Sequence, residues 1–227
     1  MEQKKKRVYR KRIPYGMMNF EDVRKDDCYY VDKTPFIEEI EAANKFFFYI
    51  RPRRFGKSLT LSMLQNYYDV NQKDKFEQLF GDLYIGKNPT PERNSYLVLK
   101  LDFSVVAAGI DDYKDGLDAT CNIRYNIFCD VYEQYLPKDI KDKMNKQDGC
   151  INQLQYICEI CDKVGQQIYL FIDEYDHFTN KILAEPQYMT SYRKQTHGEG
   201  YLRLFFDAVK AATSTSLKRV FVTGVSP

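Results

Sequence analysis

Apolar residues along this chain form two kinds of pattern, short continuous runs and longer stretches with helical spacing. Short apolar runs are typical of buried strands, and they occupy 44–50, 96–103, 168–172 and 219–225. Apolar residues spaced three and four apart predict helices at 57–70, 111–135, 151–163 and 200–212. Because strands and helices alternate, the pattern predicts an α/β fold with a mainly parallel sheet covered on both faces.

The remaining segments are rich in turn-forming residues. Glycine and proline between 76 and 94 indicate a short helical turn followed by a loop, and the mixed composition of 183–200 predicts a long loop. In VDKTPFIEEI, Thr34 is a suitable N-cap and Pro35 suits the first helical position. We therefore expect a further helix to begin at Thr34.

Composition and charge limit the class of protein. The 227 residues are 44% hydrophobic and 29% charged, which is enough apolar material for one sizeable domain. A net charge of +2 argues against a protein that covers nucleic acid with a basic surface. The basic run Lys4–Arg7 is not followed by an apolar segment, so it does not begin a secretory signal. We expect residues 1–12 to form a basic, mobile tail, with nucleic-acid contact as the alternative.

Membrane insertion, disulfides and zinc are not expected. No stretch is long and apolar enough to cross a bilayer. Six cysteines in a chain of this length, without a signal, are expected to be free thiols in the reducing cytoplasm. Cys158-x-x-Cys161 lies in a predicted helix without a second pair, and histidine occurs only at His177 and His197, which argues against a zinc site.

The triplet Gly56-Lys57-Ser58 is the first candidate for chemistry. It lies between the predicted strand 44–50 and the predicted helix 57–70. It matches the second half of the phosphate-binding motif G-x-x-x-x-G-K-[ST], whose backbone N–H groups surround phosphates, whose lysine reaches the terminal phosphates and whose hydroxyl holds Mg²⁺. Arg51 stands in place of the first glycine. The triplet also occurs by chance, so it needs support from elsewhere.

That support comes from Asp173-Glu174, which directly follows the apolar run 168–172. Acidic residues can simply end a strand at the solvent boundary. Downstream of a strand, a GKS triplet and a helix, however, the pair predicts an ATPase site in which Asp173 and Ser58 hold Mg²⁺ and Glu174 polarises the attacking water. Both motifs follow strands, where open α/β sheets bind ligands. His177 is expected to be a packing or surface residue.

The ordered set of motifs resembles the AAA-ATPase-like family of bacterial P-loop proteins. The resemblance rests on IPYGMMNFEDVRKDDCYYVDKTPFIEEIE, FFFYIRPRRFGKSLTLSML, LFGDLYIGKN, LDFS, LFIDEYD and RVFVTGVSP, from Ile13 onward. In that family RPRRFGKS is the usual form of the loop, so Arg51 departs only from the general motif. The resemblance implies ATP or ADP and Mg²⁺ as ligands. The implied nucleotide-binding loop consists of Arg53, Arg54, Phe55, Gly56, Lys57, Ser58 and Leu59.

The resemblance also implies a fold. It is the P-loop NTPase three-layer sandwich of the additional-strand (ASCE) type, with strand order second, third, fourth, first and a fifth strand beyond the first. The fourth strand would bring Thr223 or Ser226 to the γ-phosphate as a sensor, so Lys57, Glu174 and Thr223 are the candidate catalytic residues. Family members generally continue with a further strand, a helical region and often a nuclease-like domain. Residues 13–227 are therefore expected to be an incomplete ATPase-like domain.

Several residues keep more than one interpretation. Related ATPases often place residues of the segment before the loop against the base or ribose, so Asp32 and Thr34, with Lys33 between them, are candidate nucleotide-binding residues as well as a helix start. Arg53 and Arg54 either sense phosphate, contact a neighbouring subunit, or form an ion pair with an acid such as Asp102.

The sequence leaves two main functions open. The first is Mg²⁺-dependent ATP hydrolysis that drives a conformational change. The second is a regulatory module that holds ATP or ADP without hydrolysis, which Arg51 and Pro52 favour because they remove a glycine's freedom and an N–H donor from the loop. Self-association is a further expectation, since Arg53 or Arg54 could contact a neighbouring subunit. A DNA or protein partner would be bound through an absent C-terminal region, and the DNA partner follows only from the family's frequent nuclease-like domain.

Overall fold

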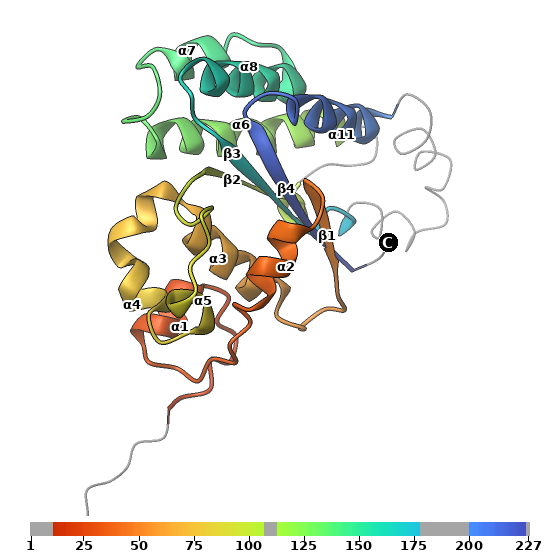
Figure 1. Cartoon of the computed structure of the whole chain (residues 1–227). Coiled ribbons are helices and arrows are strands. Elements are labelled where there is room, and N and C mark those ends of the chain that lie inside the picture. Colours follow the sequence, from red (N-terminus) through yellow and green to blue (C-terminus); the bar gives the residue numbers. More distant parts are fainter. Residues whose placement is uncertain (1–10, 107–112, 178–199, 226–227) are drawn as a thin grey trace, which may run out of the picture.

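A four-stranded parallel sheet forms the centre of the computed structural model, which describes residues 11–106, 113–177 and 200–225 (Figure 1). Its strands lie in the order β1-β4-β3-β2. Their bounds are β1 (Phe46–Ile50), β2 (Leu97–Asp102), β3 (Ile168–Asp173) and β4 (Leu217–Gly224). Each strand falls on an apolar run of the sequence, which confirms the predicted α/β class and the parallel sheet.

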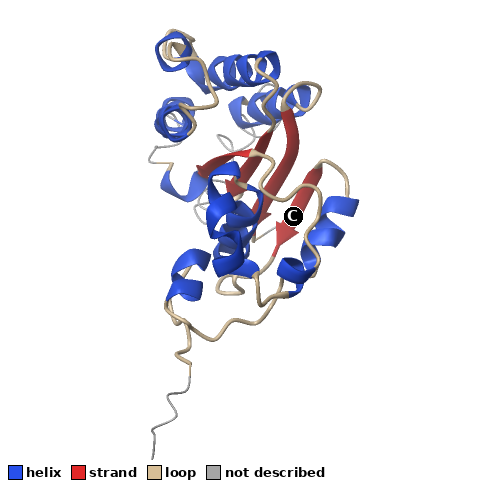
Figure 2. Ribbon diagram, turned by 60° about the vertical axis from the view of Figure 1, so that its left-hand side comes forward, coloured by secondary structure: helices blue, strands red, loops and turns tan. Residues whose placement is uncertain are grey.

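The sheet separates two layers of helices (Figure 2). One face is covered by α6 (Tyr113–Val131), α8 (Gly149–Lys163) and α11 (Tyr201–Ala212), and α7 (Ile140–Met144) packs against α8. The other face is covered by α1 (Phe20–Lys25), α2 (Phe36–Ala42), α3 (Lys57–Tyr68), α4 (Phe76–Phe80) and α5 (Tyr84–Lys87). Helices α1 and α7 were not predicted, and the segment 76–94 contains two short helices where one helical turn was expected.

The position of strand β3 in the sheet explains why its sequence is continuously apolar. It lies between β4 and β2, and all of its residues are buried. Ile168, Leu170 and Ile172 face the layer of α6, α8 and α11, whereas Tyr169 and Phe171 face the layer of α3. A central strand of a parallel sheet covered on both faces needs apolar side chains at every position.

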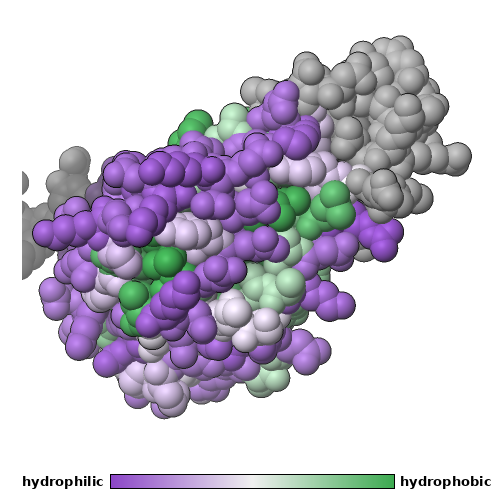
Figure 3. Space-filling model, turned by 90° about the horizontal axis from the view of Figure 1, so that it is seen from above, coloured by the Kyte–Doolittle hydropathy of each residue, from purple (hydrophilic) through white to green (hydrophobic). Residues whose placement is uncertain are grey.

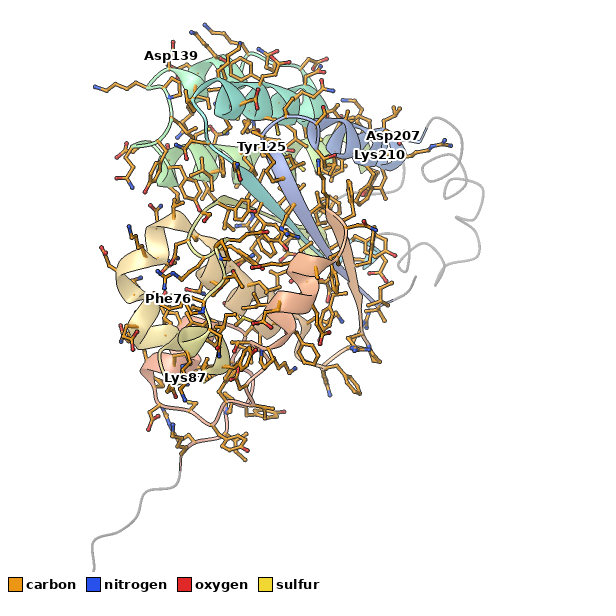
Figure 4. All side chains as sticks on the ribbon, in the orientation of Figure 1. Phe76, Lys87, Tyr125, Asp139, Asp207 and Lys210 are labelled. Atoms are coloured by element: carbon orange, nitrogen blue, oxygen red, sulfur yellow. The ribbon has the colours of Figure 1, made fainter. Side chains whose placement is uncertain are left out.

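The two cores differ in composition. The core around α3 is aromatic, with the ring of Tyr169 lying 4.3 Å from that of Phe171 and 4.9 Å from that of Tyr68. The core around α6 and α8 contains buried thiols and the fully buried Tyr125 (Figure 4). Burial raises the pKa of the Cys158 thiol to about 12. All the cysteines are buried and free, which confirms the prediction that they form no disulfide.

The predicted N-cap role of Thr34 is wrong. Helix α2 begins at Phe36 with Pro35 as its N-cap, and no side chain caps it. The Thr34 hydroxyl instead donates to Asp32 Oδ1 at 2.7 Å and accepts from the N–H of Ile85 at 3.2 Å. Asp32 Oδ2 accepts from the N–H of Tyr84 at 2.8 Å. The two side chains thus satisfy the first N–H groups of α5, far along the chain, rather than those of α2.

The surface on the side of α7 and α8 is mainly hydrophilic, with small apolar areas (Figure 3). Within the described residues, no helix has both the length and the apolar character needed to cross a membrane. The basic run Lys4–Arg7, Ser226 and nearly all of the predicted loop 183–200 lie outside the described residues.

Arg219 of β4 joins separate parts of the α2 side of the sheet. Its guanidinium donates to both carboxylate oxygens of Glu92, each at 2.6 Å. It also donates to the carbonyls of Ile40 and Glu41 at the end of α2. Burial alone would raise the pKa of Glu92, but hydrogen bonds from Arg219 and Tyr96 outweigh it and hold that pKa below its ordinary value. The carboxylate is therefore stabilised by folding.

Substitution Arg219→Met should lower the free energy of unfolding by about 2–3 kcal/mol, because it leaves Glu92 and the α2 carbonyls without their donor. A depressed carboxyl pKa contributes stability above its unfolded value, and this contribution is lost as the pH falls through the folded value. The difference in the free energy of unfolding between variant and wild type should therefore become smaller below a pH of about 4.3. Urea unfolding at pH 7 and pH 4 measures it, with the exposed Lys210→Met as control. Equal losses in both variants would contradict the role of Arg219.

Candidate nucleotide site

The candidate site lies where β1, β3 and β4 end. The strands run parallel, and Ile50 of β1 is paired with Gly224 of β4 while Ile172 of β3 is paired with Val222. The residues that follow the strands therefore meet at one edge of the sheet, as they do in open α/β sheets that bind ligands. The loop 51–56 and the acidic pair Asp173-Glu174, which lie far apart in the sequence, are brought together there.

The loop 51–56 turns sharply before α3. Gly56 has φ of 75° and Arg54 has φ of 66°, both in the left-handed region. This conformation costs a glycine little but strains an arginine, so the loop holds Arg54 in a sparsely populated conformation. The N–H of Arg51 donates to the Gly224 carbonyl at 3.2 Å, which fixes the entrance of the loop to β4.

Lys57 is the buried cation of the loop. Its side chain is only 6% exposed, and its ammonium donates to the carbonyls of Arg51 at 3.0 Å and Pro52 at 3.3 Å. The Lys57 side chain thus bonds back to the backbone of the loop that precedes it. Next to it at the start of α3, Ser58 is half-buried, and Leu59 packs against the aromatic core. Leu59 can therefore offer a ligand only its backbone.

The loop arginines do not form the ion pair that was considered for them. Among the described residues, neither Arg53 nor Arg54 pairs with an acid, and both are exposed. Asp102 instead bonds within its own turn, where its Oδ1 accepts from the N–H and the hydroxyl of Ser104 at the end of β2. Phe55, between Arg54 and Gly56, is 62% exposed.

Thr223 lies between the two acidic residues. Its fully buried hydroxyl donates to Asp173 Oδ1 and accepts from the N–H of Glu174 at 3.3 Å. The N–H of Tyr175 donates to the Thr223 carbonyl at 3.0 Å. Glu174 itself has φ of 51°, so the chain turns abruptly at this residue. His177, expected as a packing or surface residue, has Nδ1 3.6 Å from the Glu174 carboxylate.

Gly224 is a site residue that sequence reasoning missed. A Cβ at this position would lie 2.5 Å from Cε1 of Tyr175 and 2.9 Å from Oδ1 of Asp176. The absence of a side chain therefore lets the end of β4 pack against the turn that carries Glu174. A glycine inside a predicted strand is a signal for such close approach, and it was the only signal available in the sequence.

A polar cleft of about 680 Å³ begins at the acidic pair. Ser58, Asp173 and Glu174 line the cleft together with residues of α3 and with Lys100 and Asp102 of β2, and Asp102 is paired with Asp173 in the sheet. In the described part of the chain no cluster of three or more His, Cys, Asp or Glu side chains could hold a metal by itself. Oxygen ligands from Ser58 and Asp173 suit Mg²⁺, which commonly takes its remaining ligands from phosphates and water.

The segment 32–34 reaches the site through its middle residue. Asp32 and Thr34 point to α5, as described above, and do not line the cleft. Lys33 Nζ, in contrast, lies 3.2 Å from the position that a Cβ on Gly56 would occupy.

The basic residues at the loop form no ion pairs with acids of the described residues. No acidic partner within ion-pair distance exists, in the part of the chain described, for Lys33, Arg51, Arg53, Arg54 or Lys57. The N-terminal end of α3 adds its partial positive charge at the same place. These residues fit a polyanionic ligand.

Comparison with known proteins gives the family. A family model described as a predicted AAA-ATPase matches residues 14–227. A stretch of 64 residues is 44% identical to a protein of Azotobacter chroococcum mcd 1 described as "Uncharacterized protein in vnfD 5'region", and it covers 28% of this chain but only 12% of that protein. No solved structure matches the chain. Because the family model spans nearly the whole sequence, the chain belongs to the AAA-ATPase-like family of predicted AAA-ATPases.

Proposed function

We propose that this protein binds ATP with Mg²⁺ at the end of the sheet and hydrolyses it. The observation that carries the proposal is a group of cations around Gly56 without ion-pair partners among the described residues, at the same end of the sheet as the Asp173-Glu174 pair. Cations without acidic partners favour a polyanion, and an adjacent carboxylate pair favours a metal ion and a polarised water. Membership of a family of predicted AAA-ATPases supports the same ligand.

Each residue has a proposed role that follows from its position. Lys57 leaves the carbonyls of Arg51 and Pro52 and pairs with the β- and γ-phosphates. Ser58 and Asp173 hold Mg²⁺, which when bound offsets the charge of the phosphates. Glu174 orients and polarises the attacking water. Because Lys57 must exchange backbone carbonyls for phosphate, binding rearranges the loop, and we propose that this rearrangement begins the conformational change.

Thr223 acts in this proposal as a positioning residue. Its hydroxyl already bonds to Asp173 and to the backbone of Glu174, so it sets the orientation of both acids rather than being free to sense the γ-phosphate. The position of β4 between β1 and β3 supports the additional-strand P-loop class, because β4 then connects the loop strand with the acidic strand.

A regulatory module that holds nucleotide without hydrolysis is the second candidate. The bonds from Lys57 to the loop carbonyls favour it, because a closed loop that opens for the nucleotide is itself a two-state element. The strained left-handed conformation at Arg54 also favours the regulatory module, because strained backbone is common in segments that switch between two states.

Hydrolysis of Mg²⁺-ATP by wild type, Lys57→Ala and Glu174→Gln separates the two candidates. Glu174→Gln should keep ATP affinity and lose turnover by about a hundredfold or more, since it removes the group that polarises water. Lys57→Ala should lose affinity, measured by calorimetric titration, because the phosphates lose their buried cation. Equal turnover in all three proteins would contradict hydrolysis at this site. Tight binding by wild type without turnover would support the regulatory module, and no binding would overturn both.

Thr223→Val should lower stability and turnover together. Valine keeps the shape but leaves the buried Asp173 oxygen without its donor, which costs about 1–3 kcal/mol. Thr223→Ser keeps the hydroxyl and is the matched control. Urea unfolding and the Mg²⁺ dependence of ATP hydrolysis measure the two effects, and the valine variant should require more Mg²⁺ for half-maximal rate. If serine impairs the Mg²⁺ dependence as much as valine, packing of the methyl group and not the hydroxyl is responsible.

A further inference from the structure

Lys33 is a second lysine at the loop, and neither the proposed hydrolysis nor the phosphate motif uses it. Its Nζ lies 3.2 Å from the position of a Cβ on Gly56, so the ammonium lies directly against the loop. The residue is half-buried, and its ammonium forms no hydrogen bond or ion pair with any residue in the ranges that the structure describes.

The backbone on both sides of Lys33 is held firmly. Asp32 accepts from the N–H groups of Thr34 and Tyr84, each at 2.8 Å. Thr34 is fully buried and accepts from the N–H of Ile85. The carbonyl of Lys33 accepts from the N–H of Phe36 at 3.2 Å. These bonds fix the backbone of Lys33, so that only its side chain can move.

The location of Lys33 is unfavourable for a cation that has no anion nearby. The ammonium lies beside the first turn of α3, where the partial charge of the helix is positive, and beside the loop that carries Arg54 and Lys57. Like charges at this range repel, and partial burial weakens the screening by water. An anion bound at the loop would attract the ammonium and offset this repulsion.

We propose that Lys33 is a second phosphate-binding lysine of the nucleotide site, and that Asp32 and Thr34 are positioning residues that hold it against the loop. The inference rests on the proposed nucleotide site and deepens it. It replaces the interpretation in which Asp32 and Thr34 contact the base or ribose, because both side chains are committed to α5. Phosphate binding then links the loop to α5 through the segment 32–34.

Calorimetric titration with ATP and with inorganic tripolyphosphate tests the role of Lys33, because tripolyphosphate has no base or ribose. Lys33→Met should weaken both ligands by about tenfold to a hundredfold, as expected for the loss of a charge-assisted contact. Lys33→Arg, which keeps the positive charge, should lose less affinity for both ligands. The exposed Lys87 of α5, which is labelled in Figure 4, provides the matched control Lys87→Met, whose affinities should equal those of wild type.

Each contrary outcome has a separate meaning. If Lys33→Met binds both ligands as wild type does, the role of Lys33 is overturned while the proposed nucleotide site stands. If only ATP is weakened, Lys33 contacts the base or ribose, which also overturns the inference. If wild type binds neither ligand, the nucleotide site and the inference fall together. Circular dichroism of Lys33→Met and Lys33→Arg checks that both are folded.

A double-mutant cycle tests whether Thr34 acts through Lys33. Thr34→Val removes the hydroxyl that bonds Asp32 and Ile85 but keeps the shape, and it should weaken tripolyphosphate binding by less than Lys33→Met does. In Lys33→Met/Thr34→Val there should be no further loss, because the hydroxyl has no lysine left to position. Hydrogen exchange supplies an independent readout: tripolyphosphate should slow exchange of the Tyr84 and Ile85 amides in wild type and not in Lys33→Met. Additive losses, or equal protection in both proteins, would contradict the positioning role.

Discussion

Positive charge without ion-pair partners among the described residues, at one end of a parallel sheet, is the constraint on which this site depends. Lys57 is buried and bonds to backbone carbonyls of its own loop, and Lys33 lies against the same loop. The parallel strand arrangement also brings the first turn of α3 to this edge. Cations that lie close together repel one another, so an anion among them is favoured. This arrangement supports the proposal that the site binds a ligand with several negative charges.

The acidic side of the site is connected to the loop through β4. Thr223 bonds Asp173 and the backbone of Glu174, and the next residue, Gly224, accepts from the N–H of Arg51. One short segment thus touches both the entrance of the loop and the carboxylates. In the proposed function, a change at the loop would therefore reach the acids through two neighbouring residues.

The sequence predicted those features that depend on local pattern. Strands β1 to β4 follow apolar runs, and the acidic pair follows the strand that the pattern required. The role of Thr34 could not be predicted, because its partner Ile85 lies about fifty residues away and a good local N-cap competes for the interpretation. The contact of Lys33 with Gly56 could not be predicted either, because it forms only once the segment 32–34 packs on α5. The sequence also did not show that Asp102 accepts from Ser104 in the turn after β2, because that contact depends on the local backbone.

The central claim is that phosphate charge, rather than the base, determines what this site binds. Equilibrium dialysis of wild type against ATP, ADP and AMP at one fixed Mg²⁺ and salt concentration tests it most directly. We predict that affinity falls with each phosphate removed, and that AMP binds at least about tenfold more weakly than ADP. Equal affinity for ATP and AMP would mean that recognition does not depend on the cations around Gly56, and it would contradict the account.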